Sequence, residues 1–356
     1  MDIKRVTAKR REVKAAQYNK NHCKKHLDWK PLTHDELLKV RKSDRWGMMI
    51  YKNVFPDWHR TNISMFVTDE MQDEYVLPYL NPVNYNEIGM RHKKNLFQDK
   101  NYQPVFANKL KFPQTIARNI NGEWYDDQFD LISLEEVIAK LNEYSKLVFK
   151  KTMMTGHGLG VKLVEKDDYS EVINEWKKNF IVQMVVHQCN ELAYWNASSV
   201  NVVRITSLFW KGEVYILGGI LRVGAPGAFC DHLGFQNENP RVIGVYETGE
   251  LYHYCIDPDG EKKYDDCFGK KIEGVVPCYD KMLTLVKETH KFYPHNRLIG
   301  WDITVDDNYE VICIEYNPDQ PGITQTQMAV GPIFGKLSIR GCPLLKEIIH
   351  DIKNNQ

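Results

Sequence analysis

The chain has 356 residues, of which 43% are hydrophobic and 26% are charged, and its formal net charge is +0. That length is enough for one large domain or for two to three subdomains with buried cores. No apolar run approaches the ~20 residues of a membrane span, and no nucleic-acid-binding motif occurs. The eight cysteines show no Cys-x-x-Cys pair and no regular spacing, which favours free cytosolic thiols over a disulfide framework.

Positive charge is concentrated at the beginning of the chain. Residues 1–30 contain ten Lys and Arg side chains but only three Asp and Glu side chains. A basic arm of this kind attracts anionic lipids, and the same pattern is typical of a solvated surface helix. The sequence therefore leaves two interpretations open: peripheral contact with the inner face of a membrane, or a solvated terminus of a cytoplasmic protein.

Residues 1–90 are polar and mixed in composition, and we expect them to form a mostly helical extension. A helix is predicted at about 34–43, with Thr33 as its N-terminal cap. The stretch 75–84 contains Pro78 and Pro82, so we expect it to be an extended connection.

From Leu96 onward, strand patterns alternate with helix patterns. Ser133 and Glu136 have the spacing of a capping box, which predicts that a helix starts there. Pro277 and Pro343 are expected to open two further helices. The expected strands are 147–149, 161–164, 180–186, 202–208, 214–222, 298–303 and 311–314. Because hairpins are frequent among them, the sequence predicts an α+β fold with largely antiparallel sheets.

A glycine-rich loop follows one of these strands. Lys150 precedes three alternating glycines, Gly156, Gly158 and Gly160. The backbone N–H groups of such a loop approach phosphate closely, and a lysine beside it adds a point charge. The spacing differs from the Rossmann fingerprint, and no Gly-x-x-x-x-Gly-Lys-Ser/Thr motif occurs. Taken alone, the loop fits a structural hairpin turn better than a nucleotide site.

Three oxygen-bearing side chains stand at the far ends of another expected hairpin. Asp302 ends one apolar run, and Glu315 and Asn317 end the next, with a polar turn at 306–309 between them. Antiparallel strands joined by a short turn bring their far ends together, and residues two apart on a strand project from one face. Carboxylates within apolar runs are costly unless they are paired or bind a metal. The pattern favours a Mg²⁺ site over a hairpin that merely aids solubility.

In their chain order, the glycine loop and the acidic hairpin resemble the ATP-grasp superfamily. The similarity is strongest to its sugar-transfer-associated family, which is found with bacterial surface-polysaccharide genes, and it runs from about residue 75 to 335. The carboxylate triplet matches the superfamily's metal site in order and spacing, and the Asn-Val-Val-Arg segment at 201–204 is specific to this branch. The resemblance implies an ATP-grasp fold, in which two α/β subdomains clamp the nucleotide. We expect an extension at 1–90, a lysine and glycine-loop subdomain at 91–182, and a metal-binding and acceptor subdomain at 183–356.

The resemblance also implies how the nucleotide is held. Lys94 and Lys150 resemble the two nucleotide lysines, and Lys150 is also a catalytic candidate because it would contact the α and β phosphates. The loop of Gly156, Gly158 and Gly160 resembles a lid over the phosphates. A hinge between the subdomains would contact adenine, and a polar side chain after it would bind the ribose. The implied residues are Gln183, Met184 and Val186 at the hinge, followed by Glu191 or Gln188 at the ribose.

The resemblance further implies the metal ligands and the anion-binding residues. Asp302, Glu315 and Asn317 resemble the ligands of two Mg²⁺ ions, or of Mn²⁺ in their place, and ATP is the implied nucleotide. Arg204 and Arg222 resemble anion clamps near the transferred phosphate or the acceptor carboxylate, which makes both of them catalytic candidates. From the residues alone, Arg204 fits equally well as the partner of a structural carboxylate, because it lies in an apolar strand.

The chain departs from the family pattern at several positions: Lys151 replaces the proline that commonly follows the second nucleotide lysine, and Asp231-His232 replaces an Asp-Asn pair. Two further departures concern the hinge and the first lysine. Gln183 occupies a hinge position where the family often has a carboxylate. Lys93 replaces the aspartate that usually precedes the first nucleotide lysine, which leaves Lys94 and Lys109 as alternatives for that role.

Together, these features predict an ATP-dependent carboxylate–amine ligase that acts through an acyl phosphate. The implied reaction attaches an amino acid or amine to a sugar acid of a capsule or other surface-polysaccharide precursor, in free, nucleotide-linked or lipid-linked form. Two alternatives remain open at this stage. One is a nucleotide-binding regulatory or scaffold protein of glycan assembly, and the other is an ATP-dependent phosphotransferase built on the same fold.

Overall fold

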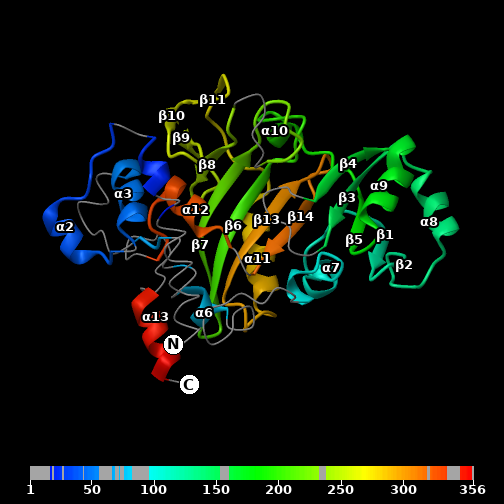
Figure 1. The fold of residues 1–356 in the computed structure, drawn as a ribbon, viewed down its shortest axis with the longest axis horizontal. Coiled ribbons are helices and arrows are strands. Elements are labelled where there is room, and N and C mark those ends of the chain that lie inside the picture. The colour runs from blue at the N-terminus through cyan, green and yellow to red at the C-terminus, as the bar shows by residue number, and fades with distance from the viewer. Residues whose placement is uncertain are drawn as a thin grey trace.

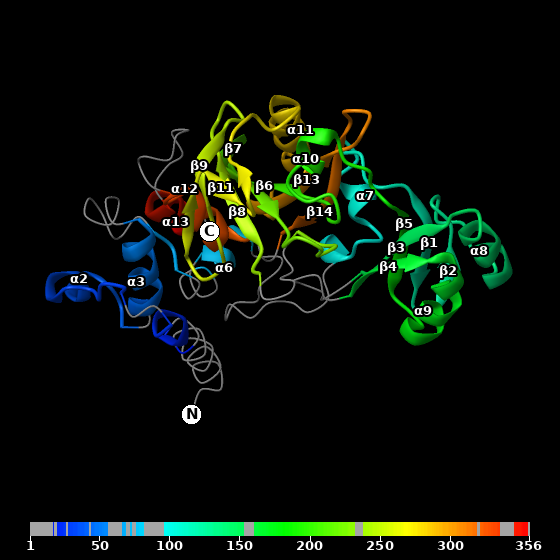
Figure 2. The ribbon, with the colours of Figure 1, turned by 90° about the horizontal axis from the view of Figure 1, so that it is seen from above.

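The structure, a computed structural model, describes residues 17, 20–25, 28–42, 44–55, 66–68, 72, 76–81, 96–152, 160–231, 238–318, 321–334 and 345–354. Among these residues, two large β-sheets, one small two-stranded sheet and the helices around them make up the fold (Figure 1). The larger sheet is central, the smaller sheet lies at one end, and the N-terminal helices lie at the other end. Figure 2 shows the same division from above.

The smaller sheet has five strands in the order β2-β1-β5-β3-β4, and all its pairings are antiparallel. Its strands are β1 (Thr115–Ile120), β2 (Glu123–Tyr125), β3 (Lys146–Lys151), β4 (Val161–Glu165) and β5 (Phe180–Met184). Its flanking helices are α8 (Leu134–Leu141), η5 (Lys166–Asp168) and α9 (Tyr169–Trp176). Helices α8 and α9 bury Leu141 and Trp176 against Phe149 of β3. The predicted capping box of Ser133 and Glu136 is confirmed at the start of α8.

The larger sheet has seven strands in the order β10-β9-β8-β7-β6-β13-β14, again with antiparallel pairings throughout. Its strands are β6 (Val202–Trp210), β7 (Glu213–Val223), β8 (Arg241–Val245), β9 (Leu251–Ile256), β10 (Lys262–Tyr264), β13 (Leu298–Val305) and β14 (Val311–Asn317). Strands β11 (Asp266–Cys267) and β12 (Lys270–Lys271) form a separate two-stranded sheet. The prediction of an α+β fold with largely antiparallel sheets is therefore confirmed.

Helices cover both faces of the larger sheet. Helix α11 (Tyr279–His290) packs on one face and α12 (Ile323–Val330) on the other. Two adjacent glycines of β7 mark these close approaches. A Cβ atom at Gly218 would lie 2.9 Å from Thr326 of α12, and a Cβ atom at Gly219 would collide with the Tyr279 hydroxyl of α11. The central strands are thus covered on both faces, which explains why almost every residue of β6 and β13 is buried.

The N-terminal segment packs on the α12 side of this sheet. Its helices are α2 (His34–Lys39), α3 (Arg45–Val54) and α6 (Leu77–Leu80). Met48 and Tyr51 of α3 share a buried cluster with Ile220 of β7 and Met328 of α12. The remaining helices of the described chain are η4 (Leu96–Gln98), α7 (Gln103–Phe106), α10 (Asn190–Ala193) and α13 (Leu345–Asn354).

Residues 96–112 precede the smaller sheet in sequence, but they pack against the larger one. Ala107 and Leu110 belong to the core of the larger sheet. The side-chain amide of Gln103 in α7 donates to the Tyr316 carbonyl of β14 at 2.9 Å and accepts from the Tyr316 N–H at 3.3 Å. This docking brings the segment that contains Lys100 alongside β14.

Two helix predictions differ from the structure in their details. The helix capped by Thr33 forms with the expected capping box, but it ends at Lys39 rather than near residue 43. The prediction of an extended connection at 75–84 is wrong for Leu77–Leu80, which form a short helix. Pro78 is compatible with that helix because it lies in the first turn, where a backbone N–H has no helical partner. Among the described residues, no helix combines the length and the apolar composition needed to cross a membrane.

Candidate functional site

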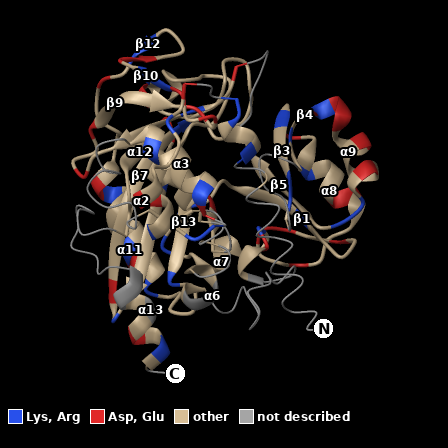
Figure 3. Ribbon diagram, turned by 60° about the vertical axis from the view of Figure 1, so that its left-hand side comes forward, with Lys and Arg blue, Asp and Glu red and all other residues tan. Residues whose placement is uncertain are grey.

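A cavity of about 1300 Å³ lies between the two sheets. Its walls come from the β3–β4 hairpin, the segment 184–188 after β5, strands β6, β7, β13 and β14, and the N-terminal segment. Figure 3 shows the lysine positions of β3 and β4 in blue. Sites for one small molecule usually measure ~300–1,000 Å³, so this cavity has room for more than one substrate.

The β13–β14 hairpin brings the three predicted metal ligands together. Asp302 lies opposite Glu315 in the strand register, and Gly300 lies opposite Asn317. The turn is held by Asp306, whose carboxylate accepts the backbone N–H groups of Asn308 and Glu310 at 3.0 and 2.7 Å. Asp302, Glu315 and Asn317 all line the cavity.

Asp302 is enclosed by hydrogen-bond donors from three strands. The Arg204 guanidinium on β6 donates to both carboxylate oxygens, with its Nη2 atom 2.6 Å from Oδ2. Arg222 Nη1 on β7 lies 3.4 Å from Oδ1, and Asn317 Nδ2 on β14 lies 3.2 Å from Oδ2. Arg222 also forms an ion pair with Asp231, at 3.1 Å from Nε to Oδ2. The two arginines therefore surround a carboxylate that was predicted to bind metal.

Glu315 has a different cationic partner. Its Oε2 atom lies 3.2 Å from the Nζ atom of Lys100. Burial raises the pKa of the Glu315 carboxyl, but the nearby Lys100, Arg204 and Lys150 charges outweigh burial and hold that pKa at about 2. Glu315 is therefore ionised at every physiological pH.

Lys150 is a buried cation that faces the cavity. The side chain is only 8% exposed, and it forms no hydrogen bond or ion pair with the residues that the structure describes. Burial lowers the pKa of its ammonium group to about 8, although the Glu315 charge opposes this shift. A buried ammonium group without a bonded anion is costly, so this position suits a lysine that binds an anionic ligand.

The glycine loop lies only partly within the described structure. Gly160 is described, with φ of 83°, and its carbonyl accepts the Lys151 N–H at 2.7 Å where the β3–β4 hairpin closes. Gly156, Gly158 and Lys94 lie outside the described residues. Their predicted roles as phosphate lid and first nucleotide lysine therefore stay predictions.

The predicted hinge lines the cavity through only some of its residues. Met184 and Val186 are part of the cavity wall, but the Gln183 side chain is buried and donates to the Pro113 carbonyl at 3.2 Å. The backbone N–H of Met184 donates to the Gln114 carbonyl at 2.9 Å. That N–H group is thus already used, which leaves the other backbone groups of the hinge for contact with a nucleobase.

The two ribose candidates lie in different surroundings. Gln188 lines the cavity, where its amide nitrogen donates to the Asn201 carbonyl at 2.7 Å and to the Thr304 hydroxyl at 2.6 Å. Glu191 is exposed, does not line the cavity, and accepts a hydrogen bond from the Tyr309 hydroxyl at 3.0 Å. Of the two candidates, Gln188 lies in the cavity with the other site residues, and Glu191 does not.

The structure also supplies a lysine that the sequence interpretation passed over. Lys100 lines the cavity and pairs with Glu315, whereas the alternative considered from sequence, Lys109, is exposed and does not line it. A sequence signal for Lys100 was present, because Asp99 stands directly before it, and an aspartate usually precedes the first nucleotide lysine in the family that the sequence resembles. The Asp99 carboxylate accepts the Asn101 N–H at 3.0 Å, which orders the chain on both sides of Lys100.

The donor chemistry of the hairpin fits a magnesium ion that arrives with phosphate. Two carboxylates and an amide are the hard oxygen ligands that Mg²⁺ prefers, usually together with water and phosphate oxygens. No group of three His, Cys, Asp or Glu side chains within the described ranges could hold a metal ion. A metal site would therefore need the Asn317 amide oxygen beside Asp302 and Glu315, and oxygens from a substrate.

A family model described as sugar-transfer associated ATP-grasp matches residues 79–338, well over half of the chain. No curated protein matches the chain.

Several solved structures share low sequence identity with the chain. D-alanyl-alanine synthetase A from Vibrio cholerae is 11% identical with a TM-score of 0.44, over 72% of this chain and 65% of that one. The VanG D-Ala:D-Ser ligase from Enterococcus faecalis is 12% identical with a TM-score of 0.43, over 73% and 61%. The ATP-grasp ligase PsnB is 11% identical with a TM-score of 0.39, over 73% and 61%. The chain matches less than two thirds of the length of each of these proteins.

Proposed function

This chain belongs to the sugar-transfer associated ATP-grasp family, and on that premise we propose that it is an ATP-dependent, ADP-forming carboxylate–amine ligase. The observation that carries this proposal is Lys150, a buried ammonium group that lines the cavity and has no bonded anion among the described residues. A polyphosphate would supply that anion.

The surroundings of Lys150 support a nucleotide whose phosphates lie towards the acidic hairpin. Lys100 and Lys150 are the lysines that would hold the phosphates, since both line the cavity and both act on the Glu315 charge. A bound Mg²⁺ ion, which Asp302, Glu315 and Asn317 would hold, supplies charge neutralisation at the transferred phosphoryl group. Met184, Val186 and Gln188 line the same cavity, where adenine and ribose would fit.

The proposed reaction needs no nucleophilic side chain. The acceptor carboxylate attacks the γ-phosphorus of ATP, which forms an acyl phosphate and releases ADP. The amine then attacks the acyl carbon, loses a proton and expels inorganic phosphate. The protein positions the substrates and supplies positive charge. Lys100 and Lys150 would offset the negative charge on the phosphates, and Arg222, which lines the same cavity, would lie where the acceptor carboxylate meets the phosphates.

For the acceptor, we propose a sugar acid of a surface-polysaccharide precursor, and for the amine an amino acid or another small amine. This choice is supported by the family description alone, which associates these proteins with sugar transfer. We place the reaction in the cytoplasm, where ATP and sugar precursors are present. The basic arm at 1–30, most of which lies outside the described residues, stays a proposed contact with a membrane surface.

The proposal is tested by incubating the purified protein with Mg·ATP and pairs of sugar acids and amines. We expect ADP release that depends on the acid, and a hydroxamate product when hydroxylamine replaces the amine. Lys150→Met should abolish turnover, whereas Lys151→Met, the matched change at the next position of β3, should retain most of it. A phosphate ester in place of the hydroxamate would instead identify a phosphotransferase. ATP binding without turnover on any pair would indicate a regulatory or scaffold protein.

A further inference from the structure

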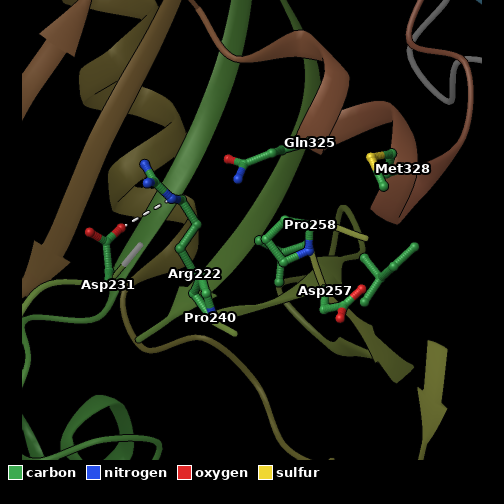
Figure 4. A pocket seen from close by; sticks show the side chains of 9 residues that line it. Arg222, Asp231, Pro240, Asp257, Pro258, Gln325 and Met328 are labelled. Carbon is green, nitrogen blue, oxygen red and sulfur yellow. Dashed lines mark ion pairs between the residues drawn. The ribbon is translucent and has the colours of Figure 1, made fainter. Parts of the chain in front are cut away.

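The cavity continues past the phosphate-binding region into a second part, which we call the far limb. Its walls are formed by Tyr51, Thr68 and Gln72 of the N-terminal segment, and by Pro258, Gln325 and Met328 around α12. Arg222 and Asp231 lie where the two parts meet, and an adjoining small cavity of about 20 Å³ shares Arg222, Asp231, Gln325 and Met328 with the far limb. Figure 4 shows this neighbourhood, in which the Gln325 side chain extends from α12 towards Arg222.

The N-terminal wall of the far limb is firmly attached to the rest of the protein. The Gln327 side chain of α12 is completely buried and bonds the N-terminal segment at three points. Its amide nitrogen donates to the Val67 carbonyl at 2.8 Å and to the Tyr51 hydroxyl at 3.1 Å, and its amide oxygen accepts the Val67 N–H at 3.1 Å. This wall precedes residue 79, where the family match begins. It is therefore a feature of the chain outside the matched family domain.

Two amide side chains of the far limb have hydrogen-bonding capacity to spare. Gln72 is 9% exposed, and its side-chain oxygen has no hydrogen-bond partner in the described structure. The Gln325 side chain forms no hydrogen bond with any described residue. A buried amide oxygen without a partner costs free energy, so a ligand that donates a hydrogen bond would be favoured there.

Charge in the far limb is balanced, in contrast to the phosphate-binding region. The Arg222 and Asp231 charges lie 3.1 Å apart, and no lysine is among the described residues that wall the far limb. An amino acid would bring both an ammonium and a carboxylate group into this space, and each would need an unmatched opposite charge. A hydroxyl group both donates and accepts hydrogen bonds, as an amide side chain does, and it needs no opposite charge on the protein.

The apolar walls agree with a ring-shaped ligand. Pro240, Pro258 and Met328 present carbon and sulfur atoms rather than polar groups to the same space. A sugar ring has C–H faces that pack on such walls and hydroxyl groups around its edge that reach amides.

We propose that the far limb binds an uncharged, hydroxyl-bearing sugar ring, with Gln72 and Gln325 as its specificity-determining residues. That the ring belongs to the acceptor whose carboxylate is activated rests on the proposed function. Binding of the ring does not require turnover, so it is tested separately from ligase activity.

The test is ligand-observed saturation-transfer NMR on the full chain, with and without a non-hydrolysable Mg·ATP analogue. The probes are methyl glycosides of glucose, galactose and N-acetylglucosamine, and, as the competing class, glycine, alanine and lysine, each at ~10 mM because single-ring ligands bind weakly. We expect saturation transfer to at least one glycoside and to none of the amino acids. Gln325→Leu and Gln72→Leu should each reduce that signal roughly fivefold, as the loss of one hydrogen bond predicts.

The matched control is Gln128→Leu, which makes the same change at an exposed glutamine beside Asp127, far from the cavity lining. It should leave the glycoside signal unchanged. If Gln72→Leu does not fold, the test rests on Gln325→Leu, which removes no hydrogen bond. Three results would overturn the proposal: no glycoside signal, a glycoside signal that survives both variants, or a signal from an amino acid that the variants remove. Binding of the ATP analogue in the same samples reports on the proposed function independently.

Discussion

Arg204 on β6 and Asp302 on β13 lie directly opposite each other in the sheet, and the Arg204 guanidinium contacts both oxygens of the Asp302 carboxylate. Both side chains are buried, at 7% and 3% exposure. Burial is the largest single influence on the pKa of the Arg204 guanidinium and lowers it. The charge and hydrogen bond of Asp302, together with the Glu315 and Asp231 charges, outweigh burial and raise that pKa above its usual value. The partner that the sequence left open for Arg204 is thus the predicted metal ligand itself.

Asp302→Asn should destabilise the protein, because it leaves a buried guanidinium without its main anion. We expect a loss of about 3 kcal/mol in the free energy of unfolding, in line with the breaking of a buried ion pair, measured by urea denaturation. Asp307→Asn, in the exposed turn of the same hairpin, should change it by less than about 0.5 kcal/mol. Adding Arg204→Met to Asp302→Asn should recover part of the loss. Equal stability of Asp302→Asn and the wild type would show that the pair contributes nothing.

Lys100→Met should weaken nucleotide binding if Lys100 holds the phosphates. The loss of one charge-assisted contact corresponds to a roughly 10- to 100-fold rise in the dissociation constant, measured by calorimetry with a non-hydrolysable Mg·ATP analogue. Lys109→Met removes the same charge from an exposed position that does not line the cavity, and it should leave the affinity for the nucleotide unchanged. The reverse ranking of the two variants would restore Lys109 as the nucleotide lysine.

Nucleotide affinity should fall as the pH rises above about 8. In the free protein burial holds the pKa of Lys150 at about 8, below its value of 10.5 in an unfolded chain. Phosphate binds the protonated form, so above pH 8 binding must first take up a proton, and affinity falls by up to about tenfold per pH unit. Calorimetry in buffers of different ionisation enthalpy would detect that proton. Lys150→Arg keeps its charge and should flatten the profile, and a profile equally steep in both proteins would exclude Lys150 as its origin.

Gln327→Leu should loosen the attachment of the N-terminal segment to α12. It leaves the Val67 N–H without its partner, while the Val67 carbonyl and the Tyr51 hydroxyl keep only their 3.1 Å hydrogen bond to each other. We therefore expect a loss of about 1–3 kcal/mol in the free energy of unfolding. Limited proteolysis should cut before residue 79 faster than in the wild type. Gln325→Leu, two residues away on the same helix, should leave both measurements unchanged, because the Gln325 side chain forms no hydrogen bond with the described residues of the N-terminal segment. Unaltered cleavage of Gln327→Leu would show that other contacts hold the segment.

Short-range patterns were enough to predict much of the fold. The capping boxes at Thr33 and Ser133 depend on residues three apart, and both formed as expected. The β13–β14 hairpin follows from two apolar runs around a polar turn, which is why its register brings Asp302 opposite Glu315. The length of the helix after Thr33 and the helix at Leu77–Leu80 were missed, because packing rather than local preference decided them.

The sequence by itself therefore determined the antiparallel α+β architecture and the convergence of the acidic hairpin, since both arise from the alternation of side chains along neighbouring strands. Only the tertiary structure decided which charges meet. It paired Arg204 with Asp302 across 98 positions, placed Lys100 rather than Lys109 in the cavity, and left Glu191 outside it. Such pairings depend on how sheets and helices pack, and no spacing in the sequence records them. The same packing seats the N-terminal segment on α12, where it becomes one wall of the cavity.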